Sequence, residues 1–236
     1  MAGNTAIVLA AGSGKRMNSA EAKQYLMLKN KPVIWYALQA FEQSDIIDAV
    51  VLVVGHGEVE HCREHIVEEY GFTKVTAVIE GGAERYLSVW EALKWLQDKQ
   101  PFSEEEYIFI HDGARPFVNE KIITDTYDAA KSYSACVAGM PVKDTIKIVD
   151  EDGFAAETPN RKTVWAVQTP QVFECELIKA AYEKMMLEEP EGITDDAMVV
   201  ETMTEQRVKL VEGSYRNIKI TTPEDLEIAN IFAVEK

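Results

Sequence analysis

The chain alternates short apolar segments of strand length with longer segments of helical period, and this rhythm limits the folds open to it. Apolar segments lie at 7–10, 49–54, 75–79, 107–110 and 135–139. Amphipathic helices are expected between them, over 32–43, 58–70, 85–98 and 119–131. Alternation of this kind produces a mostly parallel sheet with helices on both faces. We therefore predict an α/β fold.

The rhythm changes after Pro141. Residues 145–149 alternate polar and apolar side chains, 150–153 form an acidic turn with a glycine, and 162–167 read as extended again. This pattern predicts a protruding β-arm at about 142–167. Further elements are expected as helices over 174–188 and 194–203, a strand over 208–211, and a last helix with Thr222 as N-cap and Pro223 in its first turn.

Composition points to one compact acidic domain. The 236 residues are 47% hydrophobic, which is ample for a single core, so we expect one domain over 1–236. The excess of 40 acidic over 24 basic residues disfavours the basic face that nucleic-acid or membrane binding needs. No apolar stretch approaches the ~20 residues of a membrane span, and no signal peptide is apparent. We expect a cytoplasmic protein whose three cysteines are buried free thiols.

The loop after the first apolar segment is small, glycine-rich and cationic. Residues 10–17 read Ala-Ala-Gly-Ser-Gly-Lys-Arg-Met, and Lys23 follows shortly after. Met17 stands where a dinucleotide-binding fingerprint needs its third glycine, and no Gly-Lys-Ser/Thr ending completes a P-loop. The glycines alone fit an ordinary tight turn as well as a phosphate cradle. Lys15, Arg16 and Lys23 favour phosphate binding, because a turn needs no charge whereas a polyphosphate does.

Two further strand ends carry candidate site residues. Asp112 follows the apolar segment 107–110, and an acid at that edge of an open sheet can hold Mg²⁺ bridging substrate phosphates. The alternative is that Asp112 only caps a turn or pairs with Arg115. After the Gly81-Gly82 turn, Arg85 and Ser88 lie three apart on one helix face and could reach a base or ribose. A plain strand-to-helix turn explains these glycines equally well.

The histidines of the 58–70 helix match a zinc-peptidase pattern by spacing alone. His61-Cys62-Arg63-Glu64-His65 fits H-x-x-E-H, but Cys62 and Ile66 define the apolar face and the histidines fall opposite it. We predict that His61 and His65 face solvent. No Ser-His-Asp or Cys-His set can be assembled. Cations at one loop and an acid at the next suit displacement at phosphorus, which needs positioning and charge neutralisation rather than a protein nucleophile.

Seven short motifs follow one another along nearly the whole chain. They are Ala10-Ala11-Gly12-Ser13-Gly14-Lys15-Arg16-Met17, Gly81-Gly82-Ala83-Glu84-Arg85 with Ser88, His111-Asp112-Gly113-Ala114-Arg115-Pro116-Phe117, Pro141-Val142-Lys143-Asp144-Thr145, Gln168-Thr169-Pro170-Gln171, Thr194-Asp195-Asp196-Ala197 and Asn217-Ile218-Lys219. The set resembles that of the 2-C-methyl-D-erythritol 4-phosphate cytidylyltransferases. The first motif occurs in many nucleotidyltransferases, and the later ones are more selective.

The resemblance implies a Rossmann-like fold, a homodimer joined by its arms, and a Mg²⁺-dependent reaction, with another divalent cation as an alternative. The substrates would be CTP and the sugar-alcohol phosphate 2-C-methyl-D-erythritol 4-phosphate, and the products the CDP-linked alcohol and pyrophosphate, in isoprenoid precursor synthesis. The residues matching catalytic positions are Arg16, Lys23 and Lys219. Those matching nucleotide positions are Ala11, Gly12, Gly14, Gly82, Arg85, Ser88 and Asp112, the last also as metal ligand. Those matching sugar-phosphate positions are Arg115, Thr145, Arg161, Thr169 and Thr194, with Thr145 and Arg161 reaching in from the partner's arm.

Two other functions stay open. The ribitol 5-phosphate cytidylyltransferases share the first loop and the Gly-Gly-x-x-Arg turn, but typically carry Ser-Val where this chain has Gly113-Ala114. The segment 194–197 also favours the methylerythritol branch. The second alternative is a nucleotide-binding or dimerisation module that keeps the fold without turnover.

Overall fold

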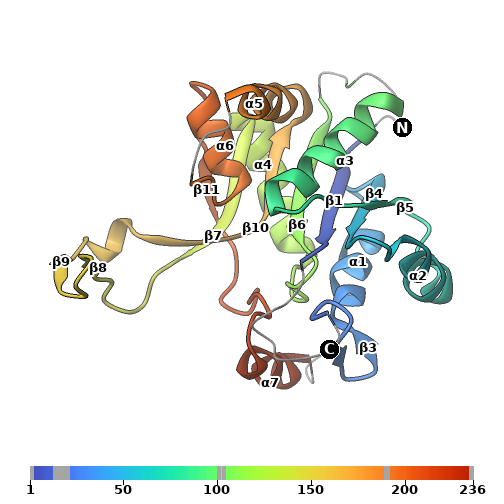
Figure 1. Ribbon diagram of the computed structural model, residues 1–236, viewed down its shortest axis with the longest axis horizontal. Coiled ribbons are helices and arrows are strands. Elements are labelled where there is room, and N and C mark those ends of the chain that lie inside the picture. The colour runs from blue at the N-terminus through green and yellow to red at the C-terminus, as the bar shows by residue number, and fades with distance from the viewer. Residues whose placement is uncertain (1–2, 13–21, 100–101, 103–104, 189–191, 234–236) are drawn as a thin grey trace.

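The computed structural model describes residues 3–12, 22–99, 102, 105–188 and 192–233. Within these ranges a seven-stranded sheet has the order β11-β7-β10-β6-β1-β4-β5 (Figure 1). Its strands are β1 (Thr5–Ala10), β4 (Ala49–Val54), β5 (Val75–Glu80), β6 (Tyr107–Asp112), β7 (Ala135–Pro141), β10 (Trp165–Glu174) and β11 (Lys209–Glu212). Two small hairpins pair β2 (Met27–Leu28) with β3 (Lys31–Pro32), and β8 (Ile148–Val149) with β9 (Ala155–Glu157).

The helices begin close to the predicted residues. They are α1 (Val33–Gln43), α2 (Val59–Cys62), α3 (Arg85–Lys99), α4 (Glu120–Tyr133), α5 (Cys175–Glu188), α6 (Asp196–Met203) and α7 (Pro223–Phe232). A π-helical stretch, Arg63–Glu68, continues α2, so the helix predicted over 58–70 is present but is not α-helical throughout. Thr222 is the N-cap of α7 as predicted, and its backbone N–H donates to the Asp225 carboxylate at 2.8 Å. The helix α6 starts at Asp196 rather than Thr194, because the side chain of Asp195 caps it by accepting from Met198 N at 2.9 Å.

The sheet is mostly parallel, as predicted, and β10 is the exception. It runs antiparallel to both neighbours, with Gln171 opposite Ile110 of β6 and Val137 of β7. The predicted extended segment ends at 167, whereas β10 continues to Glu174 through a stretch that contains Gln168, Pro170 and Gln171. The expected extended segment 162–167 is also wrong in part, since Arg161–Thr163 forms a 3₁₀ turn before the strand begins.

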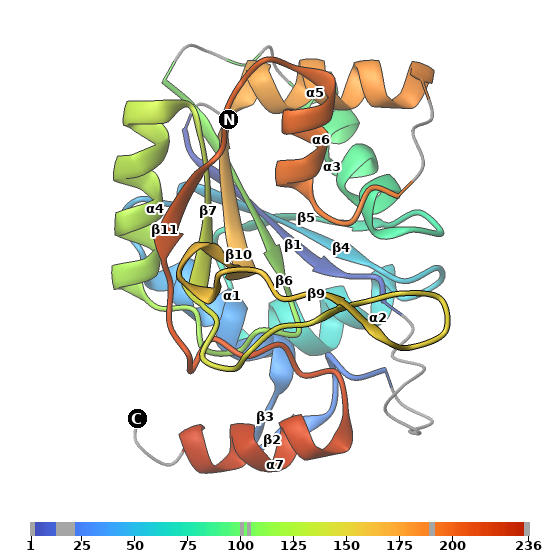
Figure 2. The same ribbon diagram turned by 90° about the vertical axis from the view of Figure 1, so that its left-hand side faces the viewer.

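Two hydrophobic layers cover the two faces of the sheet. On β1, Ala6 and Val8 pack in the layer beneath α1, α2 and α4, while Ile7 points into the layer beneath α3, α5 and α6 (Figure 2). A strand buried on both faces needs a continuous apolar run, which is why the central strands could be recognised from sequence. A smaller cluster, including Leu28 and Ile220, joins α7 to the β2–β3 hairpin.

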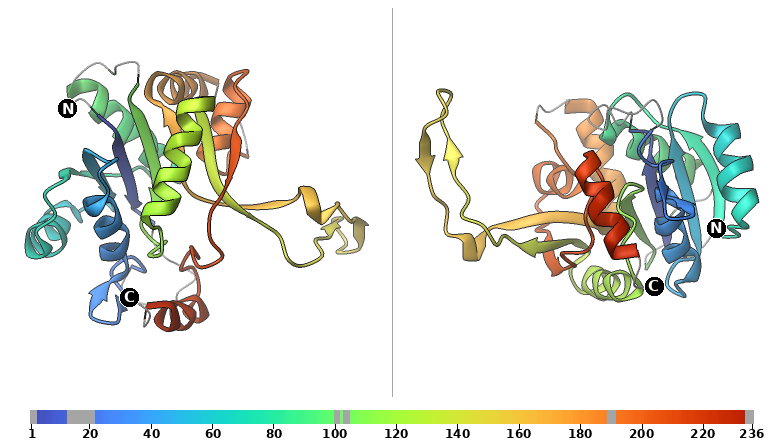
Figure 3. Two further views of the ribbon diagram at one scale, coloured as in Figure 1. Left: turned by 180° about the vertical axis from the view of Figure 1, so that it is seen from behind. Right: turned by 90° about the horizontal axis from the view of Figure 1, so that it is seen from below.

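An arm leaves the body between β7 and β10. Trp165 pairs with Pro141 at its base, and the β8–β9 hairpin lies at its far end, well away from the sheet (Figure 3). Its apolar side chains are uncovered in the single chain, with Phe154 72% exposed and Val149 57% exposed.

No helix in the described part of the chain is both long and apolar enough to cross a lipid bilayer. All three cysteines are buried free thiols, as predicted.

Candidate functional site

A pocket of about 290 Å³ opens where β1 and β6 end, beside the turn into α3. This is the edge of an open α/β sheet at which ligands bind. The predicted site residues that line it are Ala11, Gly12, Lys23, Gly82, Arg85, Ser88, Asp112 and Lys219. The structure therefore brings the three candidate segments around one pocket, although they are far apart in sequence. Leu9, Ala10, Gln24, Ala83, Glu84 and Ala114 complete the lining.

Close packing at Gly81 joins the first loop to α3. A Cβ at this position would lie 2.5 Å from Ser88 Oγ and 2.8 Å from the Cβ of Ala11. The turn therefore admits no side chain without displacing one of its neighbours. Ser88, 3% exposed, is fixed further because its hydroxyl donates to Glu84 O at 3.2 Å.

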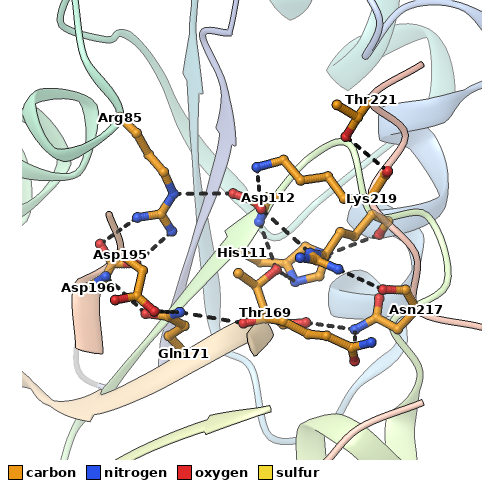
Figure 4. A network of polar contacts seen from close by, with 12 residues as sticks. Arg85, His111, Asp112, Thr169, Gln171, Asp195, Asp196, Asn217, Lys219 and Thr221 are labelled. Carbon is orange, nitrogen blue, oxygen red and sulfur yellow. Dashed lines mark hydrogen bonds and ion pairs between the residues drawn. The ribbon is translucent and has the colours of Figure 1, made fainter. Parts of the chain in front are cut away.

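Asp112 is surrounded by three cations. Lys219 Nζ lies 2.9 Å and Arg115 Nε 3.5 Å from Oδ2, and Arg85 Nε lies 3.4 Å from Oδ1 (Figure 4). Burial opposes ionisation, but the charges of Arg85, Lys219 and Arg115 hold the pKa of Asp112 well below its usual range. The alternative raised from sequence, a pair with Arg115, is present, and Asp112 also lines the pocket. With Asp196 included, three cations face two carboxylates, and the excess positive charge suits a phosphate.

A chain of hydrogen bonds supports Asp112 from behind. The Asp112 backbone N–H donates to Thr169 Oγ1 at 3.1 Å, and Thr169 Oγ1 lies 2.9 Å from Nδ1 of the fully buried His111. His111 Nε2 is 3.1 Å from Arg115 O, a carbonyl that can only accept, so Nε2 carries the hydrogen. Burial lowers the pKa of His111 to about 4, so the ring is neutral and Thr169 donates to it. Thr169, which matches a sugar-phosphate position, thus donates its hydroxyl hydrogen to His111 rather than toward the pocket.

The segment that carries Lys219 is tied to the same strand. Arg115 Nη1 donates to Asn217 O at 2.8 Å, and Asn217 Nδ2 donates to Thr169 O at 2.8 Å (Figure 4). Asn217 is fully buried. These bonds place Lys219 over the pocket, although it lies on an irregular connection rather than on a helix or strand.

Several predicted residues lie elsewhere. Thr145 and Arg161 are exposed on the arm, where Arg161 Nη1 donates to Lys143 O at 3.2 Å. Thr194 is exposed just before α6. Arg16 and Gly14 lie outside the described residues.

Sequence reasoning missed one partner of Arg85. The buried carboxylate of Asp196 binds its guanidinium through two hydrogen bonds, of 2.9 and 2.6 Å. Asp196 belongs to the motif at 194–197, but nothing in the spacing of that motif links it to a residue 111 positions away.

Two other features do not resemble a reaction centre. His61 and His65 are exposed, as predicted, and their ring centroids lie 4.9 Å apart. Within the described ranges no three His, Cys, Asp or Glu side chains come together as a possible metal site. A larger hollow of about 1030 Å³ lies beside α1 and the start of α4. Neither Asp112 nor any other predicted site residue that the structure describes is among the residues that line it. It combines Lys29 and Lys31 with Asp45 and Glu120, and no concentration of one charge marks it as a phosphate site.

Comparison with known proteins agrees with this architecture. Residues 4–235 match the family model for IspD, 2-C-methyl-D-erythritol 4-phosphate cytidylyltransferase. A protein of that name from Lachnospira eligens is 51% identical over 97% of this chain and 98% of its own, and one from Lachnoclostridium phytofermentans is 47% identical over 95% and 94%. The crystal structure of 4-diphosphocytidyl-2C-methyl-D-erythritol synthase from Anaerococcus prevotii matches with a TM-score of 0.84 and 36% identity, covering 99% of this chain and 97% of that one. This chain therefore belongs to the 2-C-methyl-D-erythritol 4-phosphate cytidylyltransferase family.

Proposed function

We propose that this chain transfers the cytidylyl group of CTP to 2-C-methyl-D-erythritol 4-phosphate and releases pyrophosphate, in the synthesis of isoprenoid precursors. The relatives reported above carry that activity in their names. The observation that carries the proposal is the position of Asp112, which lies among Arg85, Arg115 and Lys219. Asp112 lines the same pocket as Gly82 of the turn before α3.

In the proposed reaction a phosphate oxygen of the sugar alcohol forms a bond to the α-phosphorus of CTP. The bond from that phosphorus to the oxygen bridging to the β-phosphate breaks, and its electron pair leaves with pyrophosphate. The acceptor supplies the nucleophile, so the protein's task is to hold two polyanions together and to neutralise the charge that develops. The cations around the pocket fit that task.

The two ends of the pocket suggest how the substrates lie. Gly82, Arg85 and Ser88 line the α3 end, where the cytidine would sit. Ala11 and Gly12 line the same pocket, and their backbone would face the phosphates. Lys23 and Arg16 would then stabilise the triphosphate. On the acceptor side the residues would be Arg115, Lys219 and Thr194, completed by Thr145 and Arg161 of the partner's arm. Thr169 would contribute from behind Asp112, because its hydroxyl is already bonded to His111 and to the Asp112 backbone.

Asp112 would hold the Mg²⁺ on which we propose the reaction depends. Mg²⁺ takes one or two carboxylates together with phosphate oxygens, and Asp112 presents one carboxylate to a pocket suited to phosphates, so the donor set fits. When bound, the ion would neutralise phosphate oxygens. Both oxygens of Asp112 already face cations, and Lys219 Nζ lies 2.9 Å from Oδ2. Binding of the ion would therefore replace the contact between Asp112 and Lys219.

The arm supports a proposed homodimer. Phe154 and Val149 are uncovered at its far end, and a second chain would bury them. Arg161 and Thr145 lie on the same arm, outside the pocket of their own chain. A partner's arm would bring a cation to the acceptor side of the pocket.

The residue after Asp112 favours the methylerythritol branch over the ribitol 5-phosphate alternative, because this chain has Gly113 where the ribitol branch typically carries serine. The packing fits the glycine. A Cβ on Gly113 would lie 3.0 Å from Leu9 O and 3.4 Å from Ile34 Cδ1, so a serine here needs β1 or α1 to give by a few tenths of an ångström.

The test is pyrophosphate release by the purified protein with CTP, Mg²⁺ and either sugar phosphate in separate reactions. We expect release with methylerythritol phosphate, and at least 10-fold slower release with ribitol phosphate. The same protein with Asp112→Asn serves as control for a contaminating activity. Release with neither acceptor would support the non-catalytic module.

A further inference from the structure

The guanidinium of Arg85 is held from outside the pocket by a buried carboxylate. Nη1 donates to Asp196 Oδ1 at 2.9 Å and Nη2 donates to Oδ2 at 2.6 Å (Figure 4). Such a paired, charge-assisted contact fixes the plane of a guanidinium as well as its position. Asp196 is 0% exposed and does not line the pocket, so it does not touch a ligand there directly, and Arg85 is the pocket-lining residue that it binds.

Asp196 is itself fixed by two other elements. Tyr182 of α5, also fully buried, donates its hydroxyl to Asp196 Oδ1 at 2.6 Å. Gln171 of β10 accepts through Oε1 from the backbone N–H groups of Asp196 and Ala197, at 3.0 and 2.9 Å. Burial raises the pKa of Tyr182 well above its usual value, so its hydroxyl keeps the hydrogen that it donates. The carboxylate can therefore move little.

Arg85 has a second carboxylate within reach. Its Nε lies 3.4 Å from Asp112 Oδ1, a longer contact than either bond to Asp196. Without the charge of Asp196, the guanidinium would turn toward Asp112, which already faces Arg115 and Lys219. Arg85 would then leave the nucleotide end of the pocket and neutralise Asp112.

We propose that Asp196 is a positioning residue of the nucleotide pocket. Together with Tyr182 and Gln171, it holds Arg85 in the orientation that receives the nucleotide and keeps it from closing on Asp112. The inference rests on the proposed function in one respect, namely that the nucleotide bound by this pocket is CTP.

The test is a double-mutant cycle on CTP affinity, measured by titration calorimetry of the full-length protein with a fixed excess of Mg²⁺. Asp196→Asn keeps the side-chain shape and removes the charge. We expect it to weaken CTP binding about 10-fold or more in the wild-type protein, and less than 2-fold when Arg85→Gln is already present. Equal losses in the two backgrounds would show that Asp196 does not act through Arg85 and would overturn the proposal.

Two further variants separate positioning from folding. Tyr182→Phe removes one hydrogen bond to Asp196 without removing a charge, and we expect a smaller loss of CTP affinity that also disappears with Arg85→Gln. Glu201→Gln is the matched control, because it removes an exposed carboxylate from the same helix, α6, away from Arg85, Asp196 and Gln171. If Glu201→Gln weakened CTP binding as much as Asp196→Asn, the effect would belong to the charge of α6 and the proposal would be wrong.

The kinetic readout keeps this inference distinct from the proposed function. In Asp196→Asn we expect the KM for CTP to rise at least 10-fold and the KM for the acceptor to change less than 3-fold. If the wild-type protein binds CTP but transfers it to neither acceptor, the proposed function fails, and the calorimetric cycle still decides the role of Asp196.

Discussion

Neutral, buried His111 should make the protein sensitive to mild acid. The pKa of its ring is lowered from 6.5 to about 4 by burial, whereas in the unfolded chain the ring returns to its ordinary value. Between these two values the unfolded state binds a proton that the folded state does not, so the free energy of unfolding falls as the pH falls from about 7 to 4. A shift of this size corresponds to about 3 kcal/mol.

The assay is urea unfolding followed by tryptophan fluorescence at one protein concentration, at half-unit steps from pH 7 to pH 4. His111→Asn should be less stable than wild type at pH 7, because it breaks the bonds to Thr169 and Arg115. Its stability should then fall by about 3 kcal/mol less than that of wild type across the range. His61→Gln is the control for an exposed histidine. If the wild-type and His111→Asn profiles ran parallel, the explanation based on buried His111 would be refuted.

Three other perturbations test the site and the arm. Asp112→Asn and Lys23→Ala should each lower kcat by ~10²-fold or more in an initial-rate pyrophosphate assay, since developing charge loses a partner; values near wild type would show that neither residue has the assigned role. Gly81→Val should lower the free energy of unfolding by roughly 1–3 kcal/mol, because its Cβ meets Ser88 Oγ at 2.5 Å, and an unchanged urea midpoint would contradict the packing at this turn. Mixing inactive Arg161→Ala with inactive Asp112→Asn should restore about a quarter of wild-type activity, because half the dimers are mixed and each has one intact site. No recovery after exchange, confirmed by gel filtration, would place Arg161 outside the partner's site.

The central strands and their ligand-binding edge were predictable because local physics determines them. A strand such as β1, buried on both faces, needs an unbroken apolar run, and Asp112 stands two residues after the end of another such run. The place of Asp112 at the ligand-binding edge followed from that position at a strand end. The helical spacing of Cys62 and Ile66 likewise predicted that His61 and His65 face solvent, and both are exposed in the structure.

The features that escaped prediction depend on contacts distant in sequence. Gln171 is 1% exposed inside β10 because it binds the start of α6, and only that tertiary contact makes a polar stretch a buried strand. The pairing of Arg85 with Asp196 joins two segments 111 residues apart, and neither segment signals it locally. The π-helical stretch Arg63–Glu68 keeps the apolar spacing of an ordinary helix, so its hydrogen-bond pattern left no trace in the sequence.

The central claim is that this pocket joins one nucleotide to one sugar phosphate, and a competition reaction tests it most directly. The wild-type protein would be given equal amounts of ATP, GTP, UTP and CTP with Mg²⁺, together with equal methylerythritol phosphate and ribitol phosphate, and the products would be followed by phosphorus NMR. We predict that CTP is the nucleotide consumed and that CDP-methylerythritol and pyrophosphate appear in equal amounts. Formation of CDP-ribitol as the main product, consumption of the other nucleotides at similar rates, or no pyrophosphate at all would contradict the account.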